Sequence, residues 1–202
     1  MSASNCCHTI LGGLTESLAV ALGERDQHTR QHSDRVVALS VELGRHCDFS
    51  GSELDSLMLG ARFHDVGKIG IPDRVLQKPA PFDAEEWVTM KQHPVIGERI
   101  LLAIGNKEAI EAAGIVRHHH EHFDGSGYPD GLAGSAIPVF ARIISLADSY
   151  DAIAVARPYH HSRSHRQIMD ILHSEVGLKH DPDLLHAFCA VIEKSDRRAP
   201  EA

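Results

Sequence analysis

Histidine residues recur along this chain at intervals that match the length of a helical hairpin. His32, His64, His93 and His119 follow one another at spacings of 32, 29 and 26 residues. A helix of about 15 residues spans roughly 22 Å, so an up-and-down pair of helices returns the chain to the same level after about 30 residues. Side chains with this spacing can meet at one depth of a helical bundle, where bundle proteins hold their metal ligands.

The apolar residues predict helices over nearly the whole chain, and the expected fold class is all-α. Ser52 and Asp83 are expected to cap two of the helices, because Ser and Asp side chains accept hydrogen bonds from the first helical turn. Alternating patterns that would indicate strands are scarce, and the segment dense in Pro and Gly is the loop at 123–138. Apolar side chains at helical spacing place helices at 10–23, 27–46, 52–64, 84–92, 94–104, 106–120, 138–155, 165–176 and 182–195.

A chain of 202 residues is long enough for one buried core, so one domain is expected. We expect this domain to occupy residues 24–195, with a tail and a connector helix at 1–23 and a C-terminal tail at 196–202. Two interpretations of the helix at 10–23 stay open. It either caps the core, or it connects the domain to an upstream sensory or receiver domain or to a second copy in a homodimer.

The composition of the chain limits the kinds of partner that it can bind and indicates the cellular compartment in which it is expected. The formal net charge of −8 disfavours binding to DNA or RNA, which requires basic surface. No stretch approaches the ~20 apolar residues that span a bilayer, and the N-terminus lacks the basic start of a signal peptide. Cys6, Cys7, Cys47 and Cys189 form no C-x-x-C pair, so a cytoplasmic protein is expected. The 16 histidines exceed what packing requires, and their clustering indicates metal binding.

A glycine-rich loop follows the cluster of histidines at 118–122. Gly125, Gly127 and Gly131 can adopt positive φ without steric cost, which favours a tight loop. Pro129 favours an extended backbone at Tyr128, so the phenol is expected on a shaped loop beside the histidines. The other candidate ligands also stand where a helix should break, namely His64-Asp65 before Gly67 and His93 before Pro94.

These residues belong to a longer series of ordered motifs over roughly residues 24–190. The series comprises His32-Ser33-Asp34-Arg35-Val36, His64-Asp65-Val66-Gly67-Lys68-Ile69-Gly70-Ile71-Pro72, His93-Pro94 with Gly97, His119-His120-Glu121 with Asp124-Gly125, Gly127-Tyr128-Pro129 and Gly131, then Ile137-Pro138, Ala141-Arg142, Asp148 and Arg157-Pro158-Tyr159. In this series the chain resembles the HD-GYP family of HD-superfamily phosphohydrolases. The resemblance implies an HD-type helical bundle with an embedded Gly-Tyr-Pro loop.

The resemblance also implies a cyclic di-GMP phosphodiesterase with two divalent metal ions. One ion would be held by His32, His64, Asp65 and Asp148, and Asp65 would bridge to a second ion held by His93, His119 and His120. A hydroxide between the two ions would attack phosphorus and give the linear dinucleotide pGpG, with further cleavage to GMP open. Ligands of this kind suit iron or manganese, and zinc and nickel stay open as alternatives.

Further residues take roles from the same resemblance. Lys68 would contact a phosphate oxygen as a catalytic and substrate-binding group, and Arg157 would contact the second phosphate. Tyr128 would contact the substrate or anchor the loop, and Glu121 would orient a ligand histidine.

The chain departs from the family pattern at two places. Some members carry a Glu, associated with a third metal, where this chain has His28, so we expect two metals rather than three. His160 stands where the family has a basic residue, so the second phosphate is expected to be held either less firmly or in a pH-dependent way.

Two alternatives to hydrolysis of cyclic di-GMP stay open at this stage. The domain could be an HD phosphohydrolase for another cyclic dinucleotide. It could also be a catalytically weak module that senses cyclic di-GMP and passes the signal to a partner. Turnover of several cyclic dinucleotides, set against binding without product, separates these alternatives.

Overall fold

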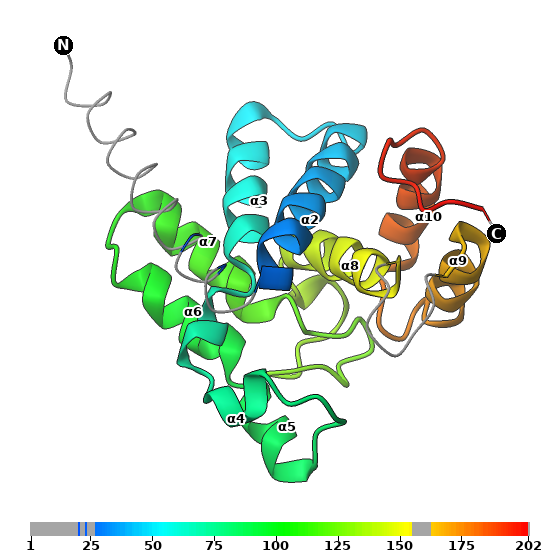
Figure 1. The fold of residues 1–202 in the computed structure, drawn as a ribbon. Helices are drawn as coiled ribbons and strands as arrows, with labels where there is room; N and C mark the ends of the chain where they lie inside the picture. The colour runs from blue at the N-terminus through cyan, green and yellow to red at the C-terminus, as the bar shows by residue number, and fades with distance from the viewer. Residues whose placement is uncertain (1–19, 21–22, 24–26, 155–162, 202) are drawn as a thin grey trace.

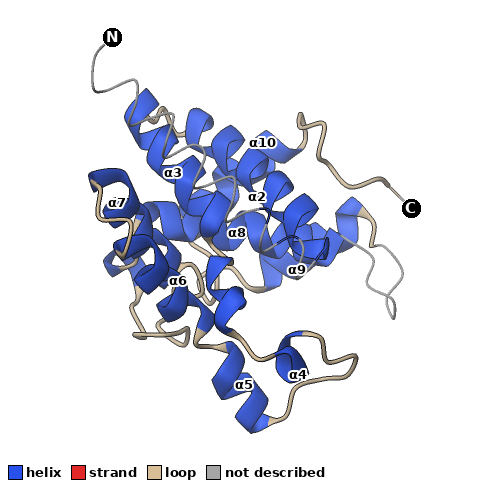
Figure 2. Ribbon diagram, turned by 60° about the vertical axis from the view of Figure 1, so that its left-hand side comes forward, coloured by secondary structure: helices blue, strands red, loops and turns tan. Residues whose placement is uncertain are grey.

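The computed structural model describes residues 20, 23, 27–154 and 163–201, and it confirms the all-α fold. Over these residues the regular structure is helical, apart from one isolated bridge between Val176 and His180 (Figure 2). The helices are α2 (Gln27–His46), α3 (Gly51–Phe63), α4 (Asp73–Leu76), α5 (Ala84–Met90), α6 (His93–Leu102), α7 (Lys107–His118), α8 (Val139–Ala154), α9 (His165–Ser174) and α10 (Pro182–Ile192), with 3-10 turns η1 (Val66–Gly70) and η2 (Gly134–Ala136).

The helix boundaries correct one predicted cap and confirm another. Asp83 caps α5 as expected, and its side chain accepts a hydrogen bond from the backbone N–H of Glu86. The prediction of Ser52 as a cap is wrong, because α3 begins earlier and Ser50 is its N-cap. Glu53 stands three residues after Ser50, and its carboxylate accepts the backbone N–H of Ser50 at 2.9 Å. This reciprocal pair fixes where α3 starts. The predicted helix at 10–23 lies almost entirely outside the described residues.

Helix α8 forms the centre of the bundle. It lies between α6 and α7 on one side and α9 and α10 on the other, with α2 across it, while α4 and α5 project at one end (Figure 1). Its apolar side chains are buried on several faces, so it carries the largest core cluster, whose members include Val36, Leu39, Leu57, Ile143, Ile144, Leu146, Phe188 and Ile192. A second apolar cluster joins α3, α6 and α7, and a third holds α4 and α5 to α6. The helix ends beside the second and third clusters carry His64, His93 and His119.

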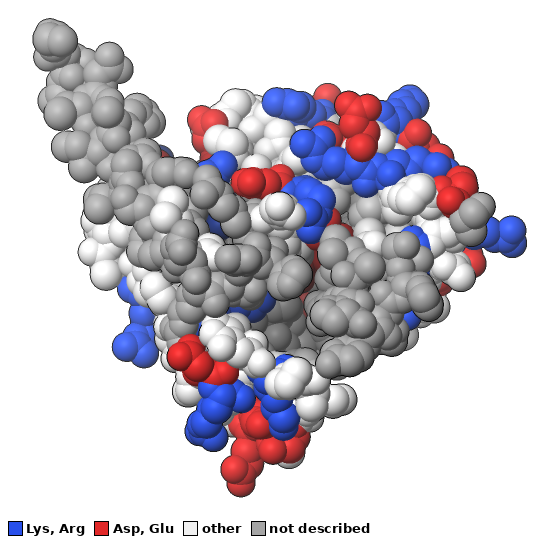
Figure 3. All heavy atoms as spheres, in the orientation of Figure 1, with Lys and Arg blue, Asp and Glu red and all other residues white. Residues whose placement is uncertain are grey.

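Two further observations describe the surface. None of the helices in the described part of the chain is long and apolar enough to cross a membrane. On the face shown in Figure 3, acidic and basic side chains are interspersed along the edge formed by α2 and α10. There Arg197 pairs with Glu42 at 3.2 Å, and Arg198 pairs with Glu193 at 3.0 Å.

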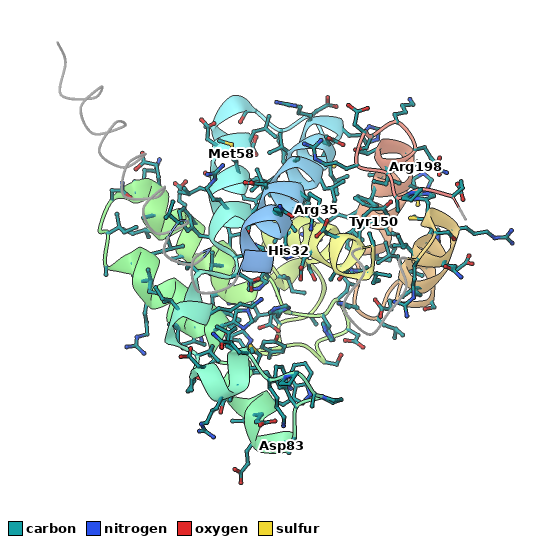
Figure 4. All side chains as sticks on the ribbon, viewed as in Figure 1. His32, Arg35, Met58, Asp83, Tyr150 and Arg198 are labelled. Carbon is teal, nitrogen blue, oxygen red and sulfur yellow. The ribbon has the colours of Figure 1, made fainter. Side chains whose placement is uncertain are left out.

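The segment predicted as a C-terminal tail is packed against the domain. Ala199 is buried, and its backbone N–H donates to the Tyr150 hydroxyl at 2.8 Å. The carbonyl of Pro200 accepts the backbone N–H of His165 at 3.0 Å. Tyr150 lies on α8 between the two aspartates of that helix, so the segment is tied to the helix that carries part of the site (Figure 4).

Replacing Tyr150 by Phe should lower the free energy of unfolding by about 1–2 kcal/mol, because the buried N–H of Ala199 would lose its acceptor. Urea unfolding of both proteins measures the difference. Ser56→Ala, which removes a hydrogen bond to Glu111 at the surface, should cost less than about 0.5 kcal/mol. Equal midpoints for Tyr150→Phe and the parent protein would contradict the role of this hydrogen bond.

Candidate metal centre

Three histidines follow the C-terminal ends of helices, and one of them, His93, is also the first residue of α6. The Nδ1 atoms of His64, His93 and His119 lie 2.7, 2.8 and 2.6 Å from the carbonyl oxygens three residues earlier, in the last turns of α3, α5 and α7. The last carbonyls of a helix have no partner within the helix and are available to such donors. A carbonyl can only accept, so Nδ1 carries the proton and the Nε2 lone pair of each ring is available to a metal. The points at which α3, α5 and α7 end therefore fix the orientation of these three histidine rings.

The seven predicted ligands gather into two groups joined by one carboxylate. We call His32, His64 and Asp148 the carboxylate position, and His93, His119 and His120 the histidine position. Within each group the potential ligand atoms all lie within 4.8 Å of one another. Asp65 stands between the groups, with Oδ2 3.4 Å from His64 Nε2 and Oδ1 3.4 Å from His93 Nε2. One carboxylate oxygen faces each group, as a bridging ligand requires.

The protonation of the centre suits a metal. Burial lowers the pKa of His93 to about 4 and that of His119 to about 3, so both rings are neutral at pH 7. Burial acts against the charge of Asp65, but the Lys68 ammonium beside it holds its pKa well below the usual value. Neutral imidazoles and ionised carboxylates are the forms that bind metal ions.

An orphaned atom in the centre points to a cation. His64 Nε2 is buried and has no hydrogen-bond partner, which is costly for a buried polar atom unless another group meets it. His32 lies between Asp148 at 3.1 Å and Asp151 at 2.7 Å. Burial disfavours its charged form, but the hydrogen bonds to both carboxylates raise the pKa of His32 to about 10. His32 would therefore give up its Nε2 proton when a metal ion binds. The other donors, neutral imidazoles and ionised carboxylates, fit divalent ions as they stand.

We expect the metal-free protein to lose stability as the pH falls from about 6.5, the ordinary pKa of histidine. The folded chain keeps His93 and His119 neutral down to about pH 4 and about pH 3. The unfolded chain protonates these rings near pH 6.5, so below that value it binds more protons and is favoured. Each ring then removes up to about 1.4 kcal/mol of unfolding free energy per pH unit.

Urea unfolding of chelator-treated protein at neutral pH and near pH 5 measures this loss. The double variant His93→Gln/His119→Gln should show a shallower dependence on pH in the same range. Identical slopes for the variant and the parent protein would show that other groups control acid stability.

Glu121 holds the glycine-rich loop instead of a histidine ring. One of its carboxylate oxygens accepts the backbone N–H of Asp130 at 2.7 Å, and the other accepts that of Leu132 at 3.1 Å. The predicted orientation of a ligand histidine by Glu121 is thus corrected. The reason is that the loop folds back over Glu121 and presents two amides that need acceptors.

Two further features fix the loop against α7. Asp130 receives two hydrogen bonds from the Arg117 guanidinium, at 2.7 and 2.8 Å, and its Oδ2 lies 3.0 Å from His118 Nε2. Gly125 and Gly131 have positive φ as expected, whereas Gly127 is required for a different reason. A Cβ at Gly127 would lie 2.2 Å from the backbone nitrogen of His122, so only glycine allows this close approach.

The loop places Tyr128 against the histidine position. Its ring stacks on that of His120, with centroids 4.9 Å apart, and the Lys91 ammonium lies 5.3 Å from the Tyr128 centroid. Lys68, predicted to contact phosphate, donates to Asp65 Oδ2 at 2.7 Å. Lys68 and Tyr128 therefore flank the same centre, and their contacts with substrate remain predictions.

The structure adds residues that the sequence reasoning did not assign. Asp151 contacts His32, and Arg35 donates two hydrogen bonds to Asp151 at 2.5 and 3.0 Å. Asp151 follows Asp148 by three residues on α8, and residues three apart are neighbours on the surface of a helix. This spacing could have suggested a shared role. The side chain of His28 and all of Arg157 and His160 lie outside the described residues.

Comparison with known proteins gives the chain its relatives. A family model described as "HD domain" matches residues 16–184. A protein of Thermotoga maritima named cyclic di-GMP phosphodiesterase is 38% identical over 164 residues, which cover 81% of this chain and 45% of the relative. A 3′3′-cGAMP-specific phosphodiesterase 2 of Vibrio cholerae is 36% identical over 172 residues, covering 85% of this chain and 33% of the relative. The chain thus spans less than half the length of these relatives.

A solved structure shares the fold. The crystal structure of a cyclic GMP-AMP-specific phosphodiesterase of V. cholerae aligns with a TM-score of 0.67 and 20% identity, over 90% of this chain and 48% of the other. The family model spans the segments that carry all seven candidate ligands, and the structure gathers those ligands at one centre. On these grounds the chain belongs to the HD domain family, in the HD-GYP branch that its motifs indicate.

Proposed function

We propose that this domain hydrolyses a 3′–5′ phosphodiester bond of cyclic di-GMP at a centre that holds two divalent metal ions. The observation that carries the proposal is the pair of ligand groups joined by Asp65, whose two oxygens face one histidine of each group. The products are linear pGpG and, after a second cleavage, GMP. Iron or manganese is the proposed metal because imidazole and carboxylate ligands suit both.

The metal ions and the side chains would each supply a different part of the chemistry. When bound, two such ions would activate water near neutral pH and neutralise charge on the phosphodiester. His32, His64 and Asp148 would hold one ion, His93, His119 and His120 would hold the other, and Asp65 would contribute to both. Lys68 brings a positive charge next to Asp65, where it can meet a phosphate oxygen as a point charge.

The loop forms one wall of the site. Tyr128 offers an aromatic face beside His120, and such a face can stack on a purine base. The hydrogen bonds from Arg117 to Asp130 and from the loop amides to Glu121 keep that wall in place. Arg157 is proposed to contact the second phosphate, as the resemblance implies, and His160 is proposed to do so in place of the family's basic residue.

A second candidate substrate is 3′3′-cGAMP, which the name of the 36% identical V. cholerae relative supports. The two substrates differ in one base, so the same phosphodiester chemistry serves both. We further propose a cytoplasmic setting, and a homodimer or an upstream sensory or receiver domain as the partner of this domain.

Anaerobic loading with Fe²⁺ or Mn²⁺, followed by chromatography of the products, tests the proposal. Cyclic di-GMP, 3′3′-cGAMP and cyclic di-AMP are offered separately at equal concentration. We expect pGpG from cyclic di-GMP at the highest rate. Faster turnover of 3′3′-cGAMP would favour the second candidate, and binding of cyclic di-GMP without product by protein that carries two ions would favour a sensor.

A further inference from the structure

The ligand histidines of the two metal positions differ in the charge of the group that the Nδ1 atom of each ring faces. In the histidine position, His93 and His119 donate their Nδ1 protons to the neutral carbonyls of Met90 and Val116. In the carboxylate position, His64 likewise faces the carbonyl of Ala61. His32 is the exception, because its Nδ1 lies 2.7 Å from the carboxylate of Asp151.

Asp151 is fixed in place by Arg35. Its side chain is 5% exposed, and the guanidinium of Arg35 contacts both of its oxygens, at 2.5 and 3.0 Å. Arg35 stands on α2 three residues after His32, so the helix that carries the ring also carries the group that holds its carboxylate. The two residues lie close together on α2 where it crosses α8 (Figure 4). His32 therefore has little freedom to turn, and its Nε2 stays directed at Asp148, 3.1 Å away.

The charges around the two positions are unequal. The carboxylate position has Asp148 within the group and Asp151 directly behind His32, in addition to its share of Asp65. The histidine position consists of imidazoles and has only its share of Asp65. The C-terminal ends of α5 and α7 each bring about half a negative charge to the histidine position, but α6 begins at His93 and its N-terminal end brings about half a positive charge there. The C-terminal end of α3 brings about half a negative charge to the carboxylate position. These helix ends nearly balance, so the difference between the positions is mainly the full charge of Asp148, because the charge of Asp151 is paired with Arg35. Buried charges at short range are weakly screened.

We propose that the two metal positions are inequivalent and fill in order, the carboxylate position first, and that Asp151 with Arg35 makes that position the tighter one. A carboxylate behind a ligand histidine raises the basicity of the ring and fixes its orientation, and its loss usually weakens metal binding ten- to a hundredfold. Arg35 and Asp151 are thus positioning residues. The inference rests on the proposed dinuclear centre, but it concerns metal affinity and not turnover.

Titration of chelator-treated protein with Mn²⁺, followed by the electron paramagnetic resonance signal of free Mn²⁺, measures the inference directly. We expect two classes of site, one ion each, whose dissociation constants differ by about tenfold or more. His120→Ala, which removes a ligand of the histidine position, should abolish the weak class and keep the tight one. Loss of the tight class in that variant would overturn the assignment.

Asp151→Asn keeps the shape of the side chain and removes its charge, so it should weaken the tight class by about ten- to a hundredfold and leave the weak class within about threefold. Asp181→Asn is the matched control, because Asp181 is 7% exposed and is also paired with an arginine, Arg142. The control should leave both classes within about threefold of the parent protein. Melting temperatures establish that each variant is folded.

Arg35→Gln provides a second route should Asp151→Asn fail to fold. It leaves Asp151 and His32 in contact and should weaken the tight class by a smaller factor. Equal weakening of both classes, or no change in either, would overturn the inference. Ordered loading without hydrolysis would leave the inference standing and reject the proposed function, while hydrolysis by a protein with two equal sites would do the reverse.

Discussion

Replacing Asp65 by Ala should reduce hydrolysis of cyclic di-GMP at least ~1000-fold, because metal-ion activation supplies several kcal/mol and each 1.4 kcal/mol is a factor of ten. The oxygens of Asp65 face both metal positions, at 3.4 Å from His64 Nε2 and 3.4 Å from His93 Nε2. Its loss removes a ligand from each position at once. Elemental analysis of the purified variant should show fewer than two ions per chain.

Folding of the Asp65→Ala protein should be largely preserved. Lys68 loses its ion pair with Asp65, and its side chain is 23% exposed and can reach water. Asp34→Ala is the control for turnover, since Asp34 is exposed on α2 two residues from His32. Near-parental hydrolysis by the Asp65→Ala protein would show that the carboxylate does not bridge the ions.

Replacing Gly67 by Ala should both destabilise the domain and remove most of its activity. A Cβ at this position would lie 1.8 Å from the carbonyl oxygen of His93 and 2.6 Å from the backbone nitrogen of Gly97. These are backbone atoms of α6, so the helix must move as a whole, and His93 moves with it. We expect a loss of about 2–4 kcal/mol of unfolding free energy, as for severe overpacking.

Gly114→Ala is the matched control for Gly67→Ala. Gly114 lies inside α7, and a Cβ there meets nothing within 4 Å. Ala should therefore stabilise the helix by about 0.5–1 kcal/mol, through its higher helix propensity. Urea unfolding and turnover are measured on both variants. An unchanged midpoint for Gly67→Ala would mean that α6 and η1 are not packed as closely as the structure indicates.

Local sequence was enough to predict most of the secondary structure. Apolar side chains at helical spacing gave α2, α7, α8, α9 and α10 to within a few residues, because a helix is stabilised by neighbours three and four residues apart. The start of α3 was missed because Ser50 and Ser52 are both good caps. The deciding residue was Glu53, which completes a capping box with Ser50.

The sequence by itself also determined which residues could form the centre. His64, His93 and His119 stand at helix ends, and their spacing of about 30 residues matches helical hairpins. The resemblance to the HD-GYP family then grouped all seven candidate ligands, and the structure brings the same seven together.

Only the tertiary structure decided what lies behind those ligands. Asp151 contacts His32 across 119 residues of chain, and Glu121 turns to the loop amides because the loop folds over it. The segment after α10 packs on Tyr150 although its sequence looks like a tail. Helices and caps depend on residues close in sequence, whereas these partners are set by how helices pack, and a pattern along the chain does not contain that information.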